Sequence, residues 1–502
     1  MATEIELKYL VSDDDIINRI TALLTHKQLA FVQSKKTLSN CYFDTTDLNL
    51  RGHDMGLRVR ICNDAIEQTI KTAGKVVGGL HQRPEYNVEI TEAFPDLTLF
   101  PRDIWQDSQQ PEVIQNSLVS LFNTDFERNI WTISGIGQSQ IELVFDKGEI
   151  SSVGSSEAIC EIEIELITGK TEDLFHLAEM LFQELEMRPG TQSKAARGYS
   201  LYHGIQEQVK LTPLELVPLP YESDIAAAFV SGVDFGLTQL QKVINAYIKS
   251  PSLEYLQKVS ELLALLRQGF WLFDAYLPAH TKYIRDELSH FIQQLKWVDN
   301  AIYFRELTNK TGNYRKKIQY SEELVSQLKL EKRRIPDVQH VIALFNSTRF
   351  NELQLLLLKL LISCPLSDEF TEADETLAHF AEHWLDKSLL DLKQAIGGEH
   401  PISSEQYINN RKILNRSLLT GSWFGDLYYK EDRLEFRNPW LDIKQGMSEL
   451  QTLWLLHNQL SLLDEQPKKL VTWQASKVEN LLLAIENSRQ NALSITPYWH
   501  RS

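Results

Sequence analysis

The first two hundred residues alternate apolar and polar side chains with the two-residue period of β-strands. This alternation runs through residues 4–10, 56–62, 67–72, 82–91, 140–146 and 158–167. Successive side chains of a strand point to opposite faces, so each segment presents one apolar and one polar face. A helical period interrupts the strands at residues 172–186. The pattern predicts an antiparallel β-domain with flanking helices.

From about residue 223 the period changes to that of amphipathic α-helices. Leu256, Val259, Leu263 and Leu266 follow the three-four spacing that places them on one helical face. Residues 205–222 contain three prolines and no clear period, so we interpret them as a linker. We therefore expect an α+β protein, with a β-domain over residues 1–204 and an all-α helical bundle over residues 223–502. Further helical patterns occur at residues 282–305, 336–363, 372–396, 403–419 and 444–490.

The polar faces of several predicted strands carry charges of one sign. Glu161, Glu163 and Glu165 share one face of a strand, and Arg58 and Arg60 share a face of another. Like charges repel, and ordinary protein surfaces intersperse the two signs. If the strands form a closed barrel with these faces inward, they enclose a polar lumen. Such a lumen requires a ligand or an ion to balance its charges.

Acidic and basic faces in one lumen suit a phosphate ligand together with a metal ion. Glutamates two residues apart in a strand have Cα atoms about 6.6–6.8 Å apart, so their carboxylates can converge on one cation. Mg²⁺ prefers oxygen ligands and binds phosphate oxygens, while arginine and lysine side chains donate hydrogen bonds to phosphate. Both features are needed for phosphoryl transfer.

Specific sequence blocks carry a family resemblance over about residues 1–204. Glu4-Ile5-Glu6-Leu7-Lys8 resembles the Glu-x-Glu-x-Lys signature of the CYTH family, the triphosphate tunnel metalloenzymes. The resemblance implies an eight-stranded antiparallel β-barrel tunnel and metal-dependent cleavage of tripolyphosphate to pyrophosphate and phosphate. Further matching blocks follow in order: Tyr42-Phe43-Asp44-Thr45, Leu57-Arg58-Val59-Arg60, Thr69-Ile70-Lys71, Arg83-Pro84-Glu85, Phe126-Glu127-Arg128, Asp146, Glu161-Ile162-Glu163-Ile164-Glu165 and Ser193-Lys194-Ala195-Ala196-Arg197-Gly198-Tyr199.

The matched blocks contain the candidate site residues. The candidate catalytic residues are Lys8, Glu4 and Glu6. Lys8 would contact phosphate or act as the base that activates the nucleophile. The alternative is that a carboxylate or a metal-bound water activates the nucleophile. The candidate ligands of Mg²⁺, or of Mn²⁺, are Glu4, Glu6, Glu85, Asp146, Glu161, Glu163 and Glu165. The candidate triphosphate-binding residues are Lys8, Arg58, Arg60, Lys71, Arg83, Arg128, Lys194 and Arg197.

Some of these assignments have an alternative. Glu85 and Asp146 would hold a second metal ion or pair with the arginines. Arg128 and Lys194 would bind the substrate or form surface ion pairs.

The helical half, about residues 220–502, resembles a CHAD domain, the usual fusion partner of this family. Residues 267–278 resemble an early helix of that domain, and Leu295-Lys296-Trp297 resembles a later one. CHAD helices are usually rich in basic residues, which suggests polyphosphate binding. Residues 254–278 contain only Lys258 and Arg267 as basic residues, which argues against polyphosphate binding by this half and favours a scaffolding role.

Bulk properties narrow the partners and the compartment. The net charge is −17, and residues 1–204 hold 31 acidic against 18 basic residues, which argues against nucleic acid as a partner. The sequence has no apolar run long enough to span a membrane and no secretory signal pattern. Four scattered cysteines fit a reducing compartment, so we expect a cytoplasmic location.

Two other functions and one other motif compete with this interpretation. Thiamine triphosphate hydrolysis or cyclisation of ATP would be another CYTH chemistry, and a binder of polyphosphate without catalysis is the second alternative.

His379-Phe380-Ala381-Glu382-His383 fits the inverted zinc-protease pattern, but the sequence offers no third ligand pattern. We interpret that motif as part of an ordinary helix.

Overall fold

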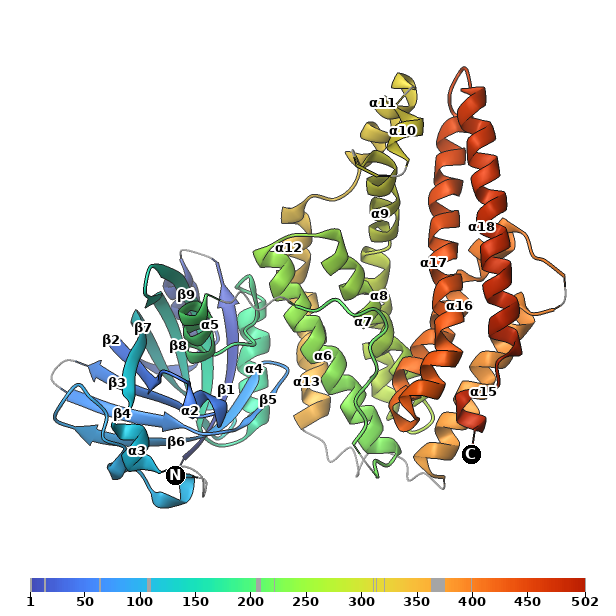
Figure 1. The fold of residues 1–502 in the computed structure, drawn as a ribbon. Coiled ribbons are helices and arrows are strands. Elements are labelled where there is room, and N and C mark those ends of the chain that lie inside the picture. Colours follow the sequence, from blue (N-terminus) through green and yellow to red (C-terminus); the bar gives the residue numbers. More distant parts are fainter. Residues whose placement is uncertain are drawn as a thin grey trace. The chain divides into compact units, whose positions relative to one another are not determined.

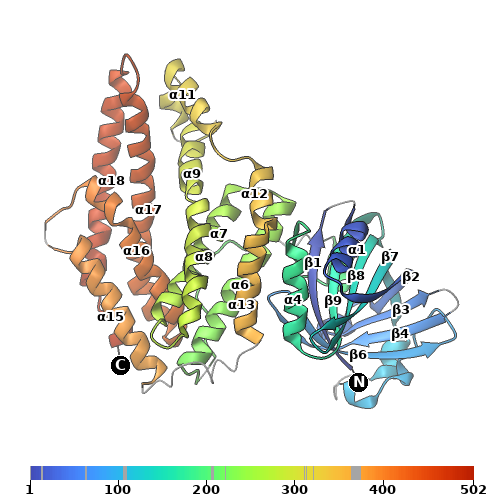
Figure 2. The same ribbon diagram turned by 180° about the vertical axis from the view of Figure 1, so that it is seen from behind.

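The computed structural model divides into two compact units, shown in Figures 1 and 2. The first contains residues 1–209 and Ile342–Lys359, and the second contains residues 210–341 and 360–502. Among the described residues, no helix is both long and apolar enough to cross a membrane. The structure describes residues 2–12, 15–62, 65–105, 110–204, 209–220, 222–309, 311–312, 314–319, 321–362, 375–398 and 400–501.

The first unit is a closed antiparallel β-barrel. Eight strands follow one another in the order β1, β9, β8, β7, β2, β3, β4 and β6, and the pairing of β6 with β1 closes the ring. Two short strands extend the sheet, β10 beside β1 and β5 beside β6. The strands are β1 (Ala2–Val11), β2 (Ala30–Thr45), β3 (Gly56–Cys62), β4 (Ala65–Lys71), β5 (Lys75–Val77), β6 (Leu80–Ile90), β7 (Leu118–Ile136), β8 (Ser139–Ser152), β9 (Ser155–Thr168) and β10 (Met187–Pro189).

The alternation in the sequence becomes two faces of this barrel. Leu7 and Tyr9 are buried on the outer face, where the Tyr9 ring meets the ring of Phe182 edge-on at 5.4 Å. Lys8 and its cross-strand partner Glu163 are buried on the inner face. The apolar face therefore packs against helices, and the charged face lines the interior.

The described residues up to 204 form seven helical segments beside the barrel strands. In α5, Gly198 packs against the Phe122 ring so closely that a Cβ atom would lie 2.0 Å from Phe122 Cε2. This glycine lets α5 approach the inner face of the barrel and brings Lys194 and Arg197 to it. The segments are α1 (Ile16–His26), α2 (Asn49–Gly52), α3 (Pro111–Gln115), α4 (Thr171–Phe182), α5 (Lys194–His203), and the 3₁₀ turns η1 (Leu97–Leu99) and η2 (Arg102–Ile104).

A segment from the helical half of the sequence packs on the barrel unit. Most of helix α13 (Thr348–Ile362) lies in the first unit, beside α4. The Thr348 hydroxyl donates to the carbonyl of Phe182 at 2.6 Å, and Asn351 Nδ2 donates to the carbonyl of Met187 at 2.5 Å. The strand pattern of the first 204 residues gives no sign of this contribution.

The second unit is all-helical. Its core contains Trp423, which is fully buried and donates a hydrogen bond from Nε1 to the carbonyl of Leu265 at 2.9 Å. Gly232 and Gly269 leave room for the indole, since a Cβ atom at either position would lie 2.0 Å from it. The helices are α6 (Ile225–Lys249), α7 (Leu253–Leu272), α8 (Lys282–Gln294), α9 (Trp297–Thr308), α10 (Arg315–Ile318), α11 (Glu322–Lys332), α15 (Leu377–Ile396), α16 (Ser404–Phe424), α17 (Lys430–Ser461) and α18 (Lys468–Ser494), with 3₁₀ turns η3 (Ala279–Thr281), η4 (Gly425–Leu427) and η5 (Tyr498–His500); α12 (Val338–Asn346) spans the boundary between the units.

The predicted fold class is confirmed: an eight-stranded antiparallel ring precedes an all-α region. The alternation did not identify β2 and β7, which are long and pair with each other over residues 30–45 and 118–134. Long helical patterns also divide: residues 282–305 form α8 and α9, and residues 444–490 form parts of α17 and α18. Pro467 lies at the N-cap of α18 and favours that break. The linker boundary at residues 205–222 stays a prediction.

Candidate active site

Three carboxylates converge on the inner face of the barrel. Asp146 of β8 pairs with Glu161 of β9, and Glu163 lies two residues further along β9 on the same face. Asp146 and Glu161 are fully buried, and Glu163 is 8% exposed. One carboxylate oxygen from each residue lies within 4.8 Å of the others. We call Asp146, Glu161 and Glu163 the acidic triad.

Two lysine ammonium groups contact the acidic triad. Lys8 Nζ lies 3.0 Å from Glu161 Oε1 and 2.5 Å from Glu163 Oε1. Lys194 Nζ contacts all three carboxylates, at 2.6 Å from Asp146 Oδ2, 2.5 Å from Glu161 Oε1 and 2.9 Å from Glu163 Oε1. Both lysines are buried, so these contacts are shielded from water.

Two arginines complete the surroundings of the acidic triad. Arg128 donates from Nε and from one terminal nitrogen to the two oxygens of Asp146 at 2.8 and 2.7 Å, and the same terminal nitrogen donates to Glu163 at 2.7 Å. Arg197 donates to Glu161 Oε2 at 3.0 Å and to Glu157 at 2.9 Å. The bidentate pair of Arg128 with Asp146 holds that carboxylate in one orientation.

Burial and charge oppose each other in the pKa values of these groups. Burial by itself lowers the pKa of Lys8, but Glu161 and Glu163 outweigh it and raise the pKa well above the ordinary value. For Glu161, burial raises the pKa, while the ammonium groups of Lys194 and Lys8 lower it to about 2. The lysine is therefore protonated and the carboxylate ionised at neutral pH in this arrangement, and the choice between phosphate contact and base for Lys8 stays a prediction.

A second group of site residues lies on β3, β4 and β6. Glu85 accepts from Arg58 at 3.3 Å and pairs with Lys71 at 3.0 Å, so its carboxylate contacts cations and is not part of the acidic triad. Arg60 donates from Nε to Asn40 Oδ1 at 2.8 Å. Burial, together with the charges of Arg58 and Arg128, lowers the pKa of Arg60 to about 10.

That lowered pKa means that the surroundings of Arg60 disfavour a positive charge. An anion bound nearby would compensate it. Arg83 has a related feature, because its Nε is buried and has no hydrogen-bond partner among the described residues.

The remaining predicted ligands lie in β1 and β9 but outside the acidic triad. Glu6 is 8% exposed and pairs in register with Glu165 and with His81. The charge of Glu6 also raises the pKa of Lys8 and of Arg128, although burial and other carboxylates have larger effects on both. Glu6 therefore lies near both cations. Glu165 is half-buried. Glu4 lies in β1 opposite Arg83, and its side chain is outside the described part of the structure.

Sequence reasoning missed two residues that orient the arginines of the site. Asn40 is buried, accepts from Arg60, and donates to the carbonyl and hydroxyl oxygens of Thr124 at 3.0 Å. Glu157 accepts from Arg197. A neutral amide and an isolated acidic residue carry no charge pattern, so their spacing did not reveal these roles.

The acidic triad has the donor set that a divalent metal requires. Its oxygen donors are those that Mg²⁺ and Mn²⁺ prefer, they are buried, and they already surround a positively charged nitrogen. The residues present therefore fit a divalent cation. Glu6 of the neighbouring strand β1 is a further candidate ligand, because its charge acts on Lys8 and Arg128, two cations that contact the triad.

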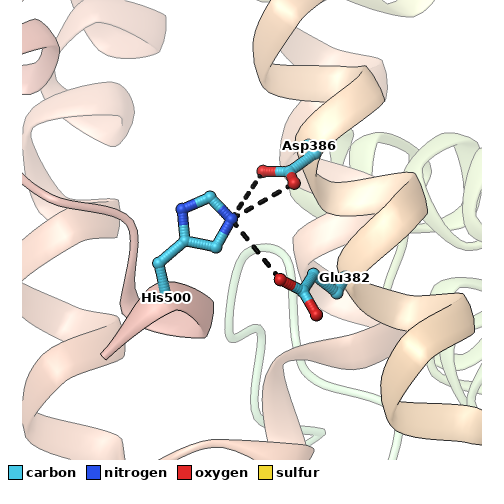
Figure 3. Close-up of side chains that lie close together, drawn as sticks. All are labelled: Glu382, Asp386 and His500. Atoms are coloured by element: carbon cyan, nitrogen blue, oxygen red, sulfur yellow. Dashed lines mark hydrogen bonds and ion pairs between the residues drawn. The ribbon is translucent and has the colours of Figure 1, made fainter. Parts of the chain in front are cut away.

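A second cluster with metal-binding residue types lies in the helical unit (Figure 3). His500 Nε2 lies 3.0 Å from Asp386 Oδ1 and 3.7 Å from Glu382 Oε1. The cluster includes Glu382 of the inverted zinc-protease motif but neither of its histidines, and His379 pairs instead with Glu375 at 2.7 Å. Its members are half-buried or exposed, and ion pairing between α15 and η5 accounts for their proximity.

Two family models together match most of the chain. Residues 2–199 match the CYTH domain, and residues 233–461 match the CHAD domain. The chain therefore contains a match to a CYTH domain followed by a match to a CHAD domain. It is also similar to the inorganic triphosphatase of Haemophilus influenzae, with 37% identity over 207 residues. That match covers 40% of this chain and 55% of the relative, so the chain spans about half the length of the curated relative.

Two solved structures are each similar to part of the chain. The CHAD domain of the plant Ricinus communis is 17% identical, with a TM-score of 0.39, and the match covers 56% of this chain and 96% of that one. A Hippeastrum protein described as an adenylyl cyclase candidate with dominant triphosphatase activity is 19% identical, with a TM-score of 0.29. That match covers 40% of this chain and 95% of that one.

Proposed function

We propose that the barrel unit hydrolyses inorganic tripolyphosphate to pyrophosphate and phosphate with the help of a divalent metal ion. The observation that carries this proposal is the meeting of the acidic triad with buried cationic side chains inside one closed barrel. A linear triphosphate needs both features, because its negative charge must be neutralised while one terminal phosphoryl group reacts. The CYTH domain and the triphosphatase relative support the same activity.

The side chains divide into two roles in this proposal. The acidic triad, with Glu6 and Glu4, would hold Mg²⁺ or Mn²⁺, which when bound neutralises phosphate oxygens and activates water. The cationic groups would bind the substrate: Arg58 and Arg60 of β3, Lys8 of β1 and Arg128 of β7. Lys71, Arg83, Lys194 and Arg197 are the further substrate-binding candidates.

The reaction balances without another reactant. Water adds to a terminal phosphorus atom, the bond from that phosphorus to the bridging oxygen breaks, and the bridging oxygen leaves with pyrophosphate. Phosphate and one proton are the other products. Charge on the leaving oxygen is stabilised by the cations around it, which is how positioning and electrostatics accelerate phosphoryl transfer.

The test is a substrate panel with the full chain. Phosphate release would be measured with Mg²⁺ and tripolyphosphate, ATP, thiamine triphosphate or long-chain polyphosphate, with cyclic AMP measured in parallel. We expect phosphate release from tripolyphosphate that EDTA abolishes and that Glu163→Gln lowers strongly. Preference for thiamine triphosphate, or formation of cyclic AMP, would replace the proposal with another CYTH chemistry. Binding without turnover of any member of the panel would support a binding module.

A further inference from the structure

The acidic triad already surrounds one positive charge supplied by the chain. Lys194 Nζ is within 2.9 Å of one oxygen from each of its three carboxylates. Asp146 and Glu161 are fully buried, and Lys194 and Glu163 are each 8% exposed. The ammonium therefore lies at the point where one cation can contact all three residues.

A metal ion bound by the same three carboxylates would need that point. A divalent cation and an ammonium group repel, and the close approach of the three oxygens leaves space for one of them. Lys8, Arg128 and Arg197 also contact the triad, so with Lys194 four cationic groups face its three carboxylates. A divalent ion added to this cluster must displace a cation, because like charges repel at close range and uncompensated buried charge is costly.

We propose that Lys194 is a built-in counter-cation of the acidic triad, which a divalent metal ion displaces and which then becomes available to the triphosphate. The proposal rests on the proposed function for its second half, because it assigns the released ammonium to the substrate. Its first half, the competition between lysine and metal, stands on the geometry of the triad alone.

Lys194 is better placed to move than Lys8. Lys8 contacts only two members of the triad, and its stem is packed against Gly190, where a Cβ atom would lie 2.9 Å from Lys8 Cγ. Lys8 also belongs to β1, which is paired with strands on both sides. Lys194 is the first residue of α5, and its Nζ lies 5.1 Å from the centre of the Phe126 ring, which can hold a cation that leaves the carboxylates.

Displacement links metal and substrate binding. If the metal frees an ammonium group for phosphate, metal raises the affinity for triphosphate, and by reciprocity triphosphate raises the affinity for metal. Substitution of Lys194 should therefore have opposite effects on the two ligands. It should strengthen the binding of metal alone, because no cation has to leave, and weaken the binding of triphosphate to the metal-loaded protein.

The experiment measures Mn²⁺ binding to the full chain without substrate, by isothermal titration calorimetry. We expect Lys194→Met to bind Mn²⁺ roughly 10-fold more tightly than the unsubstituted protein, a size typical of coupled sites. Lys194→Gln should act in the same direction, and Lys194→Arg, which keeps the charge, should not bind more tightly. Lys35→Met is the matched control, because Lys35 is exposed and pairs with Glu127 away from the triad.

Each outcome decides whether Lys194 and the metal ion compete for the acidic triad. Unchanged or weaker Mn²⁺ binding by folded Lys194→Met and Lys194→Gln would overturn it, as would tighter binding by Lys35→Met of equal size. Absence of Mn²⁺ binding in every form would also overturn it. Failure of the proposed function is recognised separately, because it would show as no tripolyphosphate turnover by a protein whose Mn²⁺ affinity still responds to Lys194.

Discussion

The Lys8 ammonium lies 2.5 Å from a carboxylate oxygen of Glu163, its cross-strand partner on the inner face of the barrel. Both side chains are buried. Burial lowers the pKa of Lys8, but the charges of Glu161 and Glu163 have the larger combined effect and raise it. A buried pair of this kind keeps both charges, because each stabilises the other away from water. It places a cation beside the carboxylates that we assign to the metal.

Replacing Lys8 should slow catalysis rather than change its pH dependence. We expect Lys8→Met to lower kcat for tripolyphosphate on the order of 10²-fold, the usual effect of losing one charge-stabilising group. Because the pKa of Lys8 lies above its ordinary value, the lysine keeps its proton at every pH from 6 to 9. The kcat–pH profile of the unsubstituted protein should therefore show no lysine ionisation in that range. A lysine inflection that disappears in Lys8→Met would restore the role of a base.

Glu6 is a candidate metal ligand outside the acidic triad, and its charge raises the pKa of Lys8 and Arg128, which contact the triad. Glu6→Gln keeps the shape of the side chain but removes its charge, so we expect turnover to fall by on the order of 10²-fold or more while the thermal midpoint stays within a few degrees. Glu149→Gln, at an exposed position of β8, is the matched control. Normal Mg²⁺-dependent turnover by Glu6→Gln would remove Glu6 from the set of ligands.

Arg60 should act mainly on substrate binding. Burial and two neighbouring arginines lower the pKa of Arg60 to about 10, so a bound anion would relieve an unfavourable charge. We expect Arg60→Ala to raise KM for tripolyphosphate about 10- to 100-fold, as for loss of a hydrogen bond to a charged group. Arg60→Lys should lose less, because it keeps the charge. Steady-state kinetics at several salt concentrations would test this, and equal KM values for both variants would contradict it.

His81 should make the barrel unit sensitive to acid. Burial and the charge of Lys8 lower the pKa of His81 to about 4. Its folded pKa lies below its unfolded value, so the unfolded chain binds more protons between about pH 6.5 and 4, and the free energy of unfolding falls as pH decreases through that window. A shift of this size corresponds to roughly 3 kcal/mol.

His81→Asn provides the comparison for this prediction. Denaturant unfolding of both proteins at pH 7 and pH 4 should show a smaller acid loss in the variant. If the two proteins lose the same stability between these pH values, His81 is not the titrating group.

Asn351 should stabilise the barrel unit from outside its continuous sequence. Its side chain is 1% exposed, and its Nδ2 donates to the carbonyl of Met187 in β10, the strand that pairs with β1. We expect Asn351→Ala to lower the free energy of unfolding by about 1–3 kcal/mol, because a buried carbonyl loses its donor. Glu352→Ala, which removes a contact to the exposed Gln183, should cost much less. Equal losses in thermal unfolding would contradict a specific role for Asn351.

The strand alternation predicted an antiparallel β-domain, the charged faces indicated a polar lumen if the strands closed, and the family resemblance implied the closed barrel. Glu161 and Glu163 are two residues apart on one strand, so their shared face follows from the geometry of a strand. Their proximity to Asp146 depends on the register between β8 and β9, which alternation does not define. The sequence analysis therefore named all three as candidate metal ligands without placing Asp146 beside Glu161 and Glu163.

Other features depended on three-dimensional contacts that no local pattern reports. Glu85 lies opposite Lys71 in register and beside Arg58, so it contacts cations rather than the triad. Long β2 and β7 escaped detection because aromatic and neutral polar residues interrupt their charge pattern. The packing of α13 on α4 joins segments that are more than 150 residues apart.

The contribution of Ile342–Lys359 has a consequence for synthesis of the chain. Proteins emerge from the ribosome N-terminal end first, and domains usually fold as they are completed. Here the ring of strands is synthesised by residue 168, but the helix that contacts β10 emerges only after residues 210–341 of the other unit. The nascent barrel must therefore wait for its last helix while more than a hundred residues of another folding unit pass out of the ribosome, so maturation of the two units is coupled in time.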